Sequence, residues 1–488
     1  MQIEFIEKKI DDINADIEII VVVDKNFDHR FVKKYKEVLK SLDFKGEQDE
    51  VVLLADSKKL FVGSNSLNSN DIRSAIASAV RKILDKKYKS LKIALYSKFE
   101  KCTATIRAQA EGLSLGSYYY NRYKRDFKVE LERIIISFEP YDKTPPIEAL
   151  KGAIDRGIKI ALSVNFVRDI VNTPPDDFYP KIMAKVAKDI ANEYKLEVNI
   201  LKKKDIKREK MNALLAVARA SSRAPRVIHL AYKPKNPKKK VALIGKGLTY
   251  DSGGLSLKPS DFMVTMKLDK SGGAAVLGII EAVAKLKLDI EVHGFIGAVE
   301  NMIGGNAYKP DDVLITKSGK TIEVRNTDAE GRIVLADVLA YAQEKVDDAD
   351  YYIDIATLTG ACVVGLGQYT MGVMGNNIDL IEKFKFAANI SAGESAAYLP
   401  FNRHLKKSLK SNIADICNIA NTRYGGAITA AMFLDFFIED KNKDKWLHLD
   451  IAGPAFVEHE WGENPSGASG ASVRAVTRFI EKLTDNKH

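Results

Sequence analysis

The order of strand-like and helical segments constrains the fold of this chain more than any other feature of its sequence. Short apolar runs alternate with patterns of helical period, and five clear runs are 17–23, 240–244, 290–299, 351–356 and 446–451. Parallel strands need a crossover, which is usually a helix. The alternation therefore predicts an α/β fold with mostly parallel, twisted sheets and helices on both faces.

The length of 488 residues is too great for one compact core, so two domains are expected. Residues 1–144 read as a smaller N-terminal α/β domain that contains no cluster of catalytic residue types. A long helical pattern at 145–171 would link it to a larger domain at 172–488. In that larger domain a mostly parallel central sheet flanked by helices is expected.

The composition, 46% hydrophobic and 29% charged, is that of an ordinary soluble globular protein. Cys102, Cys362 and Cys417 are widely separated, which gives neither a disulfide framework nor a zinc-thiolate spacing. The N-terminus lacks a basic leader with an apolar stretch, and no apolar run approaches the length of a membrane span. We therefore expect a cytoplasmic protein that does not associate with membranes.

Two carboxylates with one residue between them, Asp328 and Glu330, stand in the segment 326–332, which reads NTDAEGR. The apolar run 333–340 predicts a helix that begins just after them. The pair would then lie at a strand-to-helix turn, where ligand groups gather in open α/β sheets. The alternative is an ordinary helix cap with Arg332 as a salt-bridging neighbour.

A glycine-rich loop after the run 240–244 supplies a second set of charged residues, namely Lys246, Asp251, Lys258 and Asp269. If this set converges with the pair above, four carboxylates bring a formal charge of −4 to one place. Carboxylates in a partly dry site raise one another's pKa until they neutralise, unless cations balance them. Two divalent ions would balance that charge. Taken singly, each residue could instead be a solvated loop charge.

The spacing of these residues resembles the leucyl (cytosolic) aminopeptidase family. Besides Lys246, Asp251, Lys258, Asp269 and NTDAEGR, the segments TLTGAC at 357–362, RYGGAITAA at 423–431 and WLHLDIAG at 446–453 carry the resemblance. It extends from about residue 172 to the C-terminus, and the N-terminal part matches in general layout. The resemblance implies a bacterial-type dinuclear metallo-aminopeptidase, a hydrolase that removes N-terminal residues from peptides.

The resemblance also implies the metal ligands. Asp251, Asp328 and Glu330 would bind one ion, and Lys246, Asp251, Asp269 and Glu330 would bind the other. An ammonium group has no lone pair, so Lys246 must lose its proton, which two adjacent dications make possible. Since the set is mainly carboxylate and contains no histidine, manganese or zinc is expected, with magnesium and cobalt as alternatives.

Lys258 and Arg332 are the expected catalytic residues. The Lys258 ammonium would stabilise a tetrahedral oxyanion, and the alternative is a surface lysine. By the resemblance, Arg332 holds a bicarbonate ion that acts as general base, with help from nearby backbone amides. A guanidinium suits a planar anion and does not exchange protons near neutrality. The residues expected to bind substrate or bicarbonate are Met266, Thr357, Leu358, Gly360, Ala452 and Ala455.

Three positions depart from the pattern common in the family: Lys270 next to Asp269, Arg325 before Asn326, and the glycine-poor segment 218–222. None of them removes a ligand. Lys270 is expected to add positive charge close to the metals.

The expected partners are peptide substrates whose first residue is leucine, methionine or another apolar residue. By the resemblance the chain would form a homohexamer of two trimers, with catalytic domains at the centre. The net charge of +10 leaves DNA binding open but not favoured, because the lysine runs 202–210 and 233–240 lack interleaved aromatics. Another two-metal hydrolase, such as one acting on phosphate esters, is an alternative that the ligands alone leave open.

Overall fold

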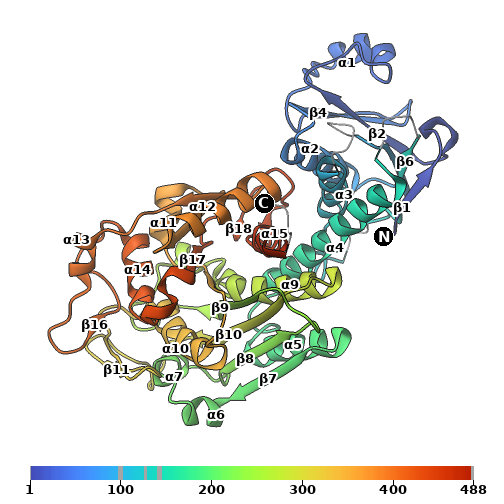
Figure 1. Cartoon of the computed structure of the whole chain (residues 1–488). Coiled ribbons are helices and arrows are strands. Elements are labelled where there is room, and N and C mark those ends of the chain that lie inside the picture. The colour runs from blue at the N-terminus through green and yellow to red at the C-terminus, as the bar shows by residue number, and fades with distance from the viewer. Residues whose placement is uncertain (1, 97–102, 126–128, 140–144, 485–488) are drawn as a thin grey trace. The chain divides into compact units, whose positions relative to one another are not determined.

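The computed structural model describes residues 2–96, 103–125, 129–139 and 145–484 (Figure 1). Contacts between Cα atoms divide the chain into two compact units. Unit 1 comprises Met1–Asn165 and Glu458–Ser466, and unit 2 comprises Phe166–Val457 and Gly467–His488. Each unit has a β-sheet and helices, so the predicted α/β class is confirmed. Cys102 lies outside the described residues, while Cys362 and Cys417 are free thiols.

Unit 1 is built on one six-stranded sheet in which every neighbouring pair is parallel except β3 and β4. Its strands, in spatial order, are β1 (Gln2–Glu7), β6 (Arg133–Phe138), β5 (Ser90–Ala94), β2 (Ile17–Val23), β4 (Lys59–Ser64) and β3 (Val51–Leu54). Its helices are α1 (Lys36–Ser41), α2 (Ser69–Ile83), α3 (Ala104–Gly116) and the first part of α4 (Ile147–Asn172). The apolar faces of α2 and α3 bury the core of this unit against β2 and β5.

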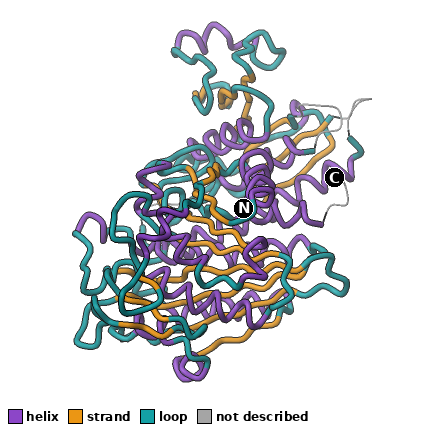
Figure 2. The backbone as a smooth tube through the Cα atoms, turned by 60° about the vertical axis from the view of Figure 1, so that its left-hand side comes forward, coloured by secondary structure: helices purple, strands orange, loops and turns teal. Residues whose placement is uncertain are grey.

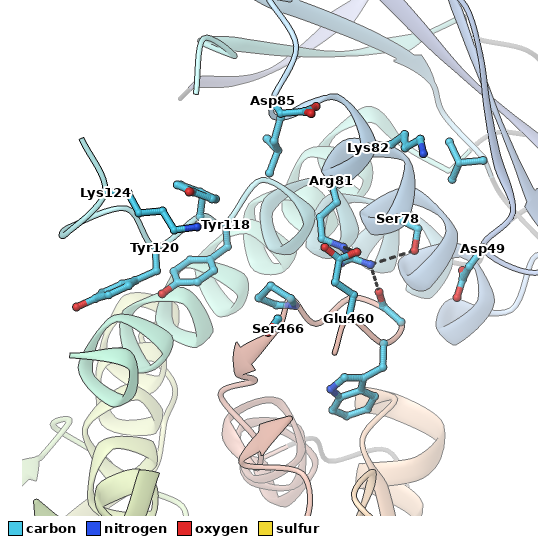
Figure 3. Close-up of a pocket in the computed structure, with 16 residues that line it drawn as sticks. Asp49, Ser78, Arg81, Lys82, Asp85, Tyr118, Tyr120, Lys124, Glu460 and Ser466 are labelled. Atoms are coloured by element: carbon cyan, nitrogen blue, oxygen red, sulfur yellow. Dashed lines mark hydrogen bonds and ion pairs between the residues drawn. The ribbon is translucent and has the colours of Figure 1, made fainter. Parts of the chain in front are cut away.

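A short segment from late in the chain, Glu458–Ser466, belongs to unit 1 (Figure 3). Arg81 of α2 holds it: Nε lies 3.3 Å from Glu460 Oε2, and Nη2 donates to the Gly462 carbonyl at 2.6 Å. Nη2 also donates to Ser78 Oγ at 3.2 Å. Arg81, Ser78 and this segment line a cavity of about 940 Å³. Because Glu460 pairs with the Arg81 charge, we read these bonds as an anchor for the segment.

Unit 2 is built on an eight-stranded mixed sheet whose four central strands are parallel. Antiparallel pairs join this centre to its flanks on both sides. The strands, in spatial order, are β15 (Ser395–Tyr398), β14 (Thr370–Gly375), β17 (Trp446–Asp450), β13 (Tyr351–Ala356), β9 (Lys240–Asp251), β10 (Glu291–Asn301), β8 (Arg226–Tyr232) and β7 (Glu197–Lys202). The predicted mostly parallel centre is therefore confirmed.

Helices cover both faces of this sheet (Figure 2). A Cβ atom at Gly294 of β10 would meet Ile280 of α9 (Ser271–Leu286), and one at Gly297 would meet Val334 of α10 (Glu330–Lys345). Residues three apart on a strand point to opposite faces, so α9 and α10 lie on opposite sides of the sheet. The core between α10 and the sheet includes Ile244, Phe295 and Trp446.

The remaining helices of unit 2 are α5 (Pro180–Tyr194), α6 (Lys203–Arg208), α7 (Asn212–Ala218), α8 (Ser260–Met263), α11 (Gly360–Leu366), α12 (Ile378–Phe386), α13 (Arg403–Lys406), α14 (Gly426–Asp435) and α15 (Val473–Thr484). Two small sheets consist of β11 (Val313–Ile315), β12 (Thr321–Glu323) and β16 (Ile416–Cys417), and of β18 (Phe456–Val457) and β19 (Gly467–Ala468). The shorter helical turns are η1 (Ile10–Asp12), η2 (Lys33–Tyr35), η3 (Met266–Lys270), η4 (Ala387–Ala392), η5 (Lys407–Leu409) and η6 (Asp440–Lys445).

Most predicted strands and helices are present, with shifted ends. β2 and β13 have the predicted bounds, whereas β9 continues through the glycine-rich part to Asp251. The helix predicted to begin just after the carboxylate pair begins at Glu330 itself, so this carboxylate is its first residue. Among the described residues, no helix combines the length and the apolar character that a membrane span requires.

Candidate active site

The carboxyl ends of the four parallel central strands of unit 2 meet at the candidate site. β9 supplies Lys246 and ends at Asp251, and its neighbour β10 ends at Asn301, in register with Asp251. β13 leads into Thr357, and β17 ends at Asp450. Ligands of open α/β sheets bind at this edge, which agrees with the predicted position.

The predicted metal ligands lie together. Oxygen atoms of Asp251, Asp328 and Glu330 lie within 4.8 Å of one another, close enough to share a metal ion. Lys246 joins Asp269 to this group, because its Nζ lies 2.7 Å from Asp269 Oδ1 and 3.0 Å from Glu330 Oε1. The structure thus brings five residues from three separate segments into one cluster, of which only Asp328 is partly exposed.

Two lysines neutralise much of the negative charge of this cluster. Lys258 Nζ lies 2.9 Å from Asp251 Oδ2 and 2.6 Å from Asp328 Oδ1. Burial alone would lower the pKa of Lys246 and of Lys258, but the surrounding carboxylates outweigh it and raise both values. Each lysine is therefore a cation here, held between two carboxylates.

Despite these lysines, three carboxylates of the cluster have raised pKa values. Burial and the charge of Asp251 raise the pKa of Glu330 to about 8, and burial also raises the pKa of Asp269 and Asp328. Asp269 Oδ2 and Glu330 Oε2 are buried with no hydrogen-bond partner among the described residues. Unsatisfied buried carboxylate oxygens of this kind are suited to hard divalent cations, so the residues fit the expected metals.

Glycine is required beside the cluster. A Cβ atom at Gly331 would lie 2.5 Å from Lys246 Cε and 2.7 Å from its Nζ. Gly253 has φ +84°, and a Cβ atom there would lie 2.9 Å from Asp328 Oδ1. Helix α10 and the loop after β9 can therefore approach the charged side chains only because these two positions lack a side chain.

Several supporting residues were not singled out from the sequence. Asn301 Nδ2 donates to Asp251 Oδ1 at 2.8 Å and to the Thr327 carbonyl at 3.0 Å. Tyr308 OH donates to the same carbonyl at 2.6 Å. Asn301 could have been found as the polar residue that ends the strand-like run after 290. Tyr308 lies in a loop, and its sequence context gives no such signal.

Arg332 is buried beside the cluster, where its Nη1 donates to the Asn418 carbonyl at 2.9 Å. Burial lowers the pKa of Arg332 to about 10, against the opposing effects of Glu330 and Asp450. It lines a cavity of about 570 Å³ together with Arg325, Lys410 and Arg423. The described residues that line this cavity include four cations and no carboxylate, which suits a small anion.

The predicted substrate-binding residues lie on segments that contact one another. Thr357 Oγ1 donates to Asp269 Oδ1 at 2.8 Å, and the Leu358 amide donates to Asp450 Oδ1 at 3.2 Å. Met266 and Ala452 are half-buried, and Gly360 is exposed. Ala455 is only 2% exposed, so it offers little surface to a ligand.

Lys270 points its ammonium group at backbone carbonyls. Its Nζ donates to the carbonyls of Thr173 at 2.9 Å and Lys267 at 2.8 Å. Burial, with a further effect of Lys267, lowers the pKa of Lys270 to about 7. At neutral pH this lysine therefore carries only about half of the positive charge expected from the departure.

Comparisons with known proteins agree with this geometry. The catalytic-domain profile of the cytosol aminopeptidase family matches residues 165–477. The chain belongs to the cytosol aminopeptidase family. The N-terminal-domain profile of the same family matches residues 20–126. This membership makes the chain a metal-dependent aminopeptidase, and it removes the grounds for a hydrolase of phosphate esters.

Relatives of this aminopeptidase match it over nearly its whole length. It is 50% identical over 475 residues to the probable cytosol aminopeptidase of Wolinella succinogenes, covering 97% of both chains. The probable cytosol aminopeptidase of Campylobacter jejuni is 49% identical over 487 residues, or 99% of both chains.

Two solved structures share the fold of this aminopeptidase. The bottromycin maturation enzyme BotP in complex with Mn superposes with a TM-score of 0.86 at 31% identity, covering 97% of this chain and 100% of that one. A point mutant of tomato leucine aminopeptidase gives a TM-score of 0.88 at 31% identity, covering 99% of this chain and 96% of that one.

Proposed function

We propose that this chain removes apolar N-terminal residues, leucine and methionine above all, from peptides at a two-metal centre. Asp251, Asp328 and Glu330 would hold one ion, and Lys246 and Asp269 would join Asp251 and Glu330 around the other. When bound, such ions supply a nucleophilic water near neutral pH and polarise the scissile carbonyl. The observation that carries this proposal is the unsatisfied pair of buried oxygens, Asp269 Oδ2 and Glu330 Oε2, within a cluster of carboxylates. Manganese or zinc suits this oxygen-rich set.

Lys258 is proposed to stabilise the oxyanion that develops on the scissile carbonyl. Its side chain is mostly buried and reaches Asp251 and Asp328, so its ammonium stands at the edge of the metal centre. A fixed cation in a partly dry site stabilises developing negative charge more than one in water does.

Arg332 is proposed to hold the bicarbonate that accepts the proton of the attacking water. The support is the cavity in which Arg332 lies, because its described lining residues include four cations and no carboxylate. We expect the rate in carbonate-free buffer to rise when bicarbonate is added, and we expect Arg332→Ala to abolish that response. An undiminished response in the variant would contradict the assignment.

A panel of substrates tests the proposed specificity. The enzyme loaded with Mn²⁺ should hydrolyse the p-nitroanilides of leucine and methionine and should not hydrolyse acetyl-leucine p-nitroanilide, which lacks a free amine. The glutamyl substrate should be slow, because its charge must be desolvated against the apolar Met266 and Ala452. One methylene is worth only about 1–3 kcal/mol, so leucine and methionine should differ modestly. Equal rates on the leucyl and glutamyl substrates would contradict this picture.

Glu330→Gln tests the metal centre itself, since Glu330 is proposed to serve both ions. We expect a loss of activity of at least about 10³-fold that added Mn²⁺ does not restore. Glu344→Gln is the matched control, because Glu344 lies on the same helix α10 and its side chain is 51% exposed. Full turnover by Glu330→Gln would refute the two-metal proposal.

By the same family resemblance we propose a cytoplasmic homohexamer. No observation on the described residues favours DNA as a partner.

A further inference from the structure

Asp450, the last residue of β17, is a fully buried carboxylate at which two segments of the site meet. Its Oδ1 accepts the backbone N–H groups of Leu358 at 3.2 Å and Ala452 at 3.1 Å. Its Oδ2 accepts the hydroxyl of Thr359 at 2.7 Å. A buried carboxylate is costly unless it is hydrogen-bonded, so these bonds fix both segments on the end of β17.

The first of these segments supports two of the proposed metal ligands. The Thr357 carbonyl accepts a hydrogen bond from Lys246 Nζ at 2.8 Å. The Thr357 hydroxyl donates to Asp269 Oδ1 at 2.8 Å. Because Asp450 holds the two residues that follow Thr357, it determines where this carbonyl and this hydroxyl stand.

The second segment begins at Ala452, which is proposed to contact the substrate side chain. The Ala452 amide and the Leu358 amide bind the same oxygen of Asp450. This one carboxylate therefore fixes the distance between Leu358, which follows Thr357, and Ala452, which is proposed to contact the substrate.

We propose that Asp450 is a positioning residue for the peptidase reaction, holding segment 357–359 against Lys246 and Asp269 and holding Ala452 beside it. This inference rests on the proposed metal centre. Asp450 acts through Thr357, Leu358 and Ala452, to which it is hydrogen-bonded or adjacent, and its charge also acts on Arg332. Removing a group that hydrogen-bonds to a metal ligand and orients it commonly lowers metal affinity by about 10–100-fold.

Two substitutions separate the hydrogen bonds of Asp450 from its bulk. Asp450→Ala removes all three bonds. Asp450→Asn keeps the size of the side chain, and its Oδ1 can still accept the two amides. The Thr359 hydroxyl can rotate to accept from the new NH₂ group, because a hydroxyl both donates and accepts. The asparagine variant should therefore keep the positions of both segments.

Titration calorimetry with Mn²⁺ and steady-state kinetics on leucine p-nitroanilide test the proposal. We expect Asp450→Ala to bind Mn²⁺ about 10–100-fold more weakly than wild type and to lose kcat. Asp450→Asn should bind Mn²⁺ within about threefold of wild type, since positioning by hydrogen bonds is retained. Unchanged Mn²⁺ affinity in Asp450→Ala, or an equal loss in both variants, would overturn the proposal.

Asp435→Ala is the matched control. Asp435 is buried in the same unit, accepts a hydrogen bond from Asn376 Nδ2 at 2.9 Å and pairs with Lys443 at 3.0 Å, but none of these residues belongs to the site. An equal loss of Mn²⁺ affinity in this control would show a general effect of destabilisation and would refute the assignment. Wild type that binds Mn²⁺ without cleaving peptides would refute the proposed function, while the calorimetric comparison would still decide the role of Asp450.

Discussion

Single residues set the electrostatics of the site, and Lys246 shows this most clearly. Its ammonium is paired with Asp269 and Glu330, and these carboxylates raise its pKa despite full burial. To serve as a metal ligand it must release that proton, so metal binding and proton release are coupled. This coupling would let the side chain act as a counter-ion without metal and as the proposed ligand with metal bound.

Gly331→Ala tests whether the position of Lys246 matters. The new Cβ atom would lie 2.5 Å from Lys246 Cε, and the flexible end of that lysine must move away. Alanine favours a helix over glycine, so α10 should not lose stability. We therefore expect a folded enzyme whose Mn²⁺ affinity, measured by calorimetry, falls about 10-fold or more and whose kcat falls with it.

Gly305→Ala is the control for that substitution, since nothing lies within 4 Å of a Cβ atom there. It should leave both metal affinity and kcat within about twofold of wild type. Wild-type metal binding by Gly331→Ala would show that Lys246 need not occupy the observed position.

At the scale of elements, strand ends determine the site. Lys246, Asp251 and Asn301 come together because β9 and β10 are parallel neighbours in register. The sequence predicts that Lys246 and Asp251 follow a buried strand, but it singles out neither Asn301 nor the pairing of β9 with β10. It does not predict that α10 starts at Glu330, because helix ends depend on tertiary contacts that a hydrophobic pattern does not contain.

Two features were not predicted from the sequence, the strand β1 and the role of Asp450, because neither produces a strong hydrophobic pattern. β1 is half-buried, with the exposed polar residues Gln2 and Glu7 at its ends, so its apolar signal is weak. Asp450 reads as part of an apolar strand, and its role depends on amides of Leu358 and Ala452. Hydrogen bonds between a side chain and backbone groups distant in sequence produce no periodic pattern of residue types in the sequence. They become visible only once the strands are paired.

A histidine pair on the sheet of unit 2 should make its stability depend on pH. His229 belongs to β8, and its Nε2 lies 2.9 Å from His293 Nδ1. Its ring stacks on that of Phe295 with a centroid distance of 4.2 Å. Burial, followed by the effect of His293, lowers the pKa of His229 to about 4. An unfolded histidine has a pKa of about 6.5, so between pH 6.5 and 4 the unfolded chain binds more protons than the folded one.

The free energy of unfolding should therefore fall as the pH is lowered through that window. His229 alone should contribute a loss on the order of 2 kcal/mol at pH 5 relative to pH 8. Urea denaturation of His229→Gln should show a correspondingly smaller difference between these two pH values. His404→Gln is the control, because His404 is exposed on α13. Equal pH dependence in wild type and His229→Gln would refute the prediction.

At the scale of the whole molecule, the strongly exposed apolar side chains of the described residues are unevenly distributed. Those more than 60% exposed all belong to unit 2: Phe262, Val264, Val364, Ile390, Ile413 and Tyr424. Single exposed apolar side chains are common on soluble proteins, whereas surfaces on which several of them gather commonly mark protein interfaces. Unit 2 is therefore the part of the chain that we expect to pack against other copies.

The assembly prediction follows from this distribution and from the family resemblance. Light scattering should give a mass close to six subunits of 54.1 kDa. Val364 is 89% exposed in unit 2, so Val364→Asp should bury a charge in the interface and shift the assembly toward smaller species. Leu42→Asp changes an exposed residue of unit 1 and should leave the mass unchanged. A wild-type mass near one subunit would refute the hexamer, and dissociation by Leu42→Asp alone would assign the interface to unit 1.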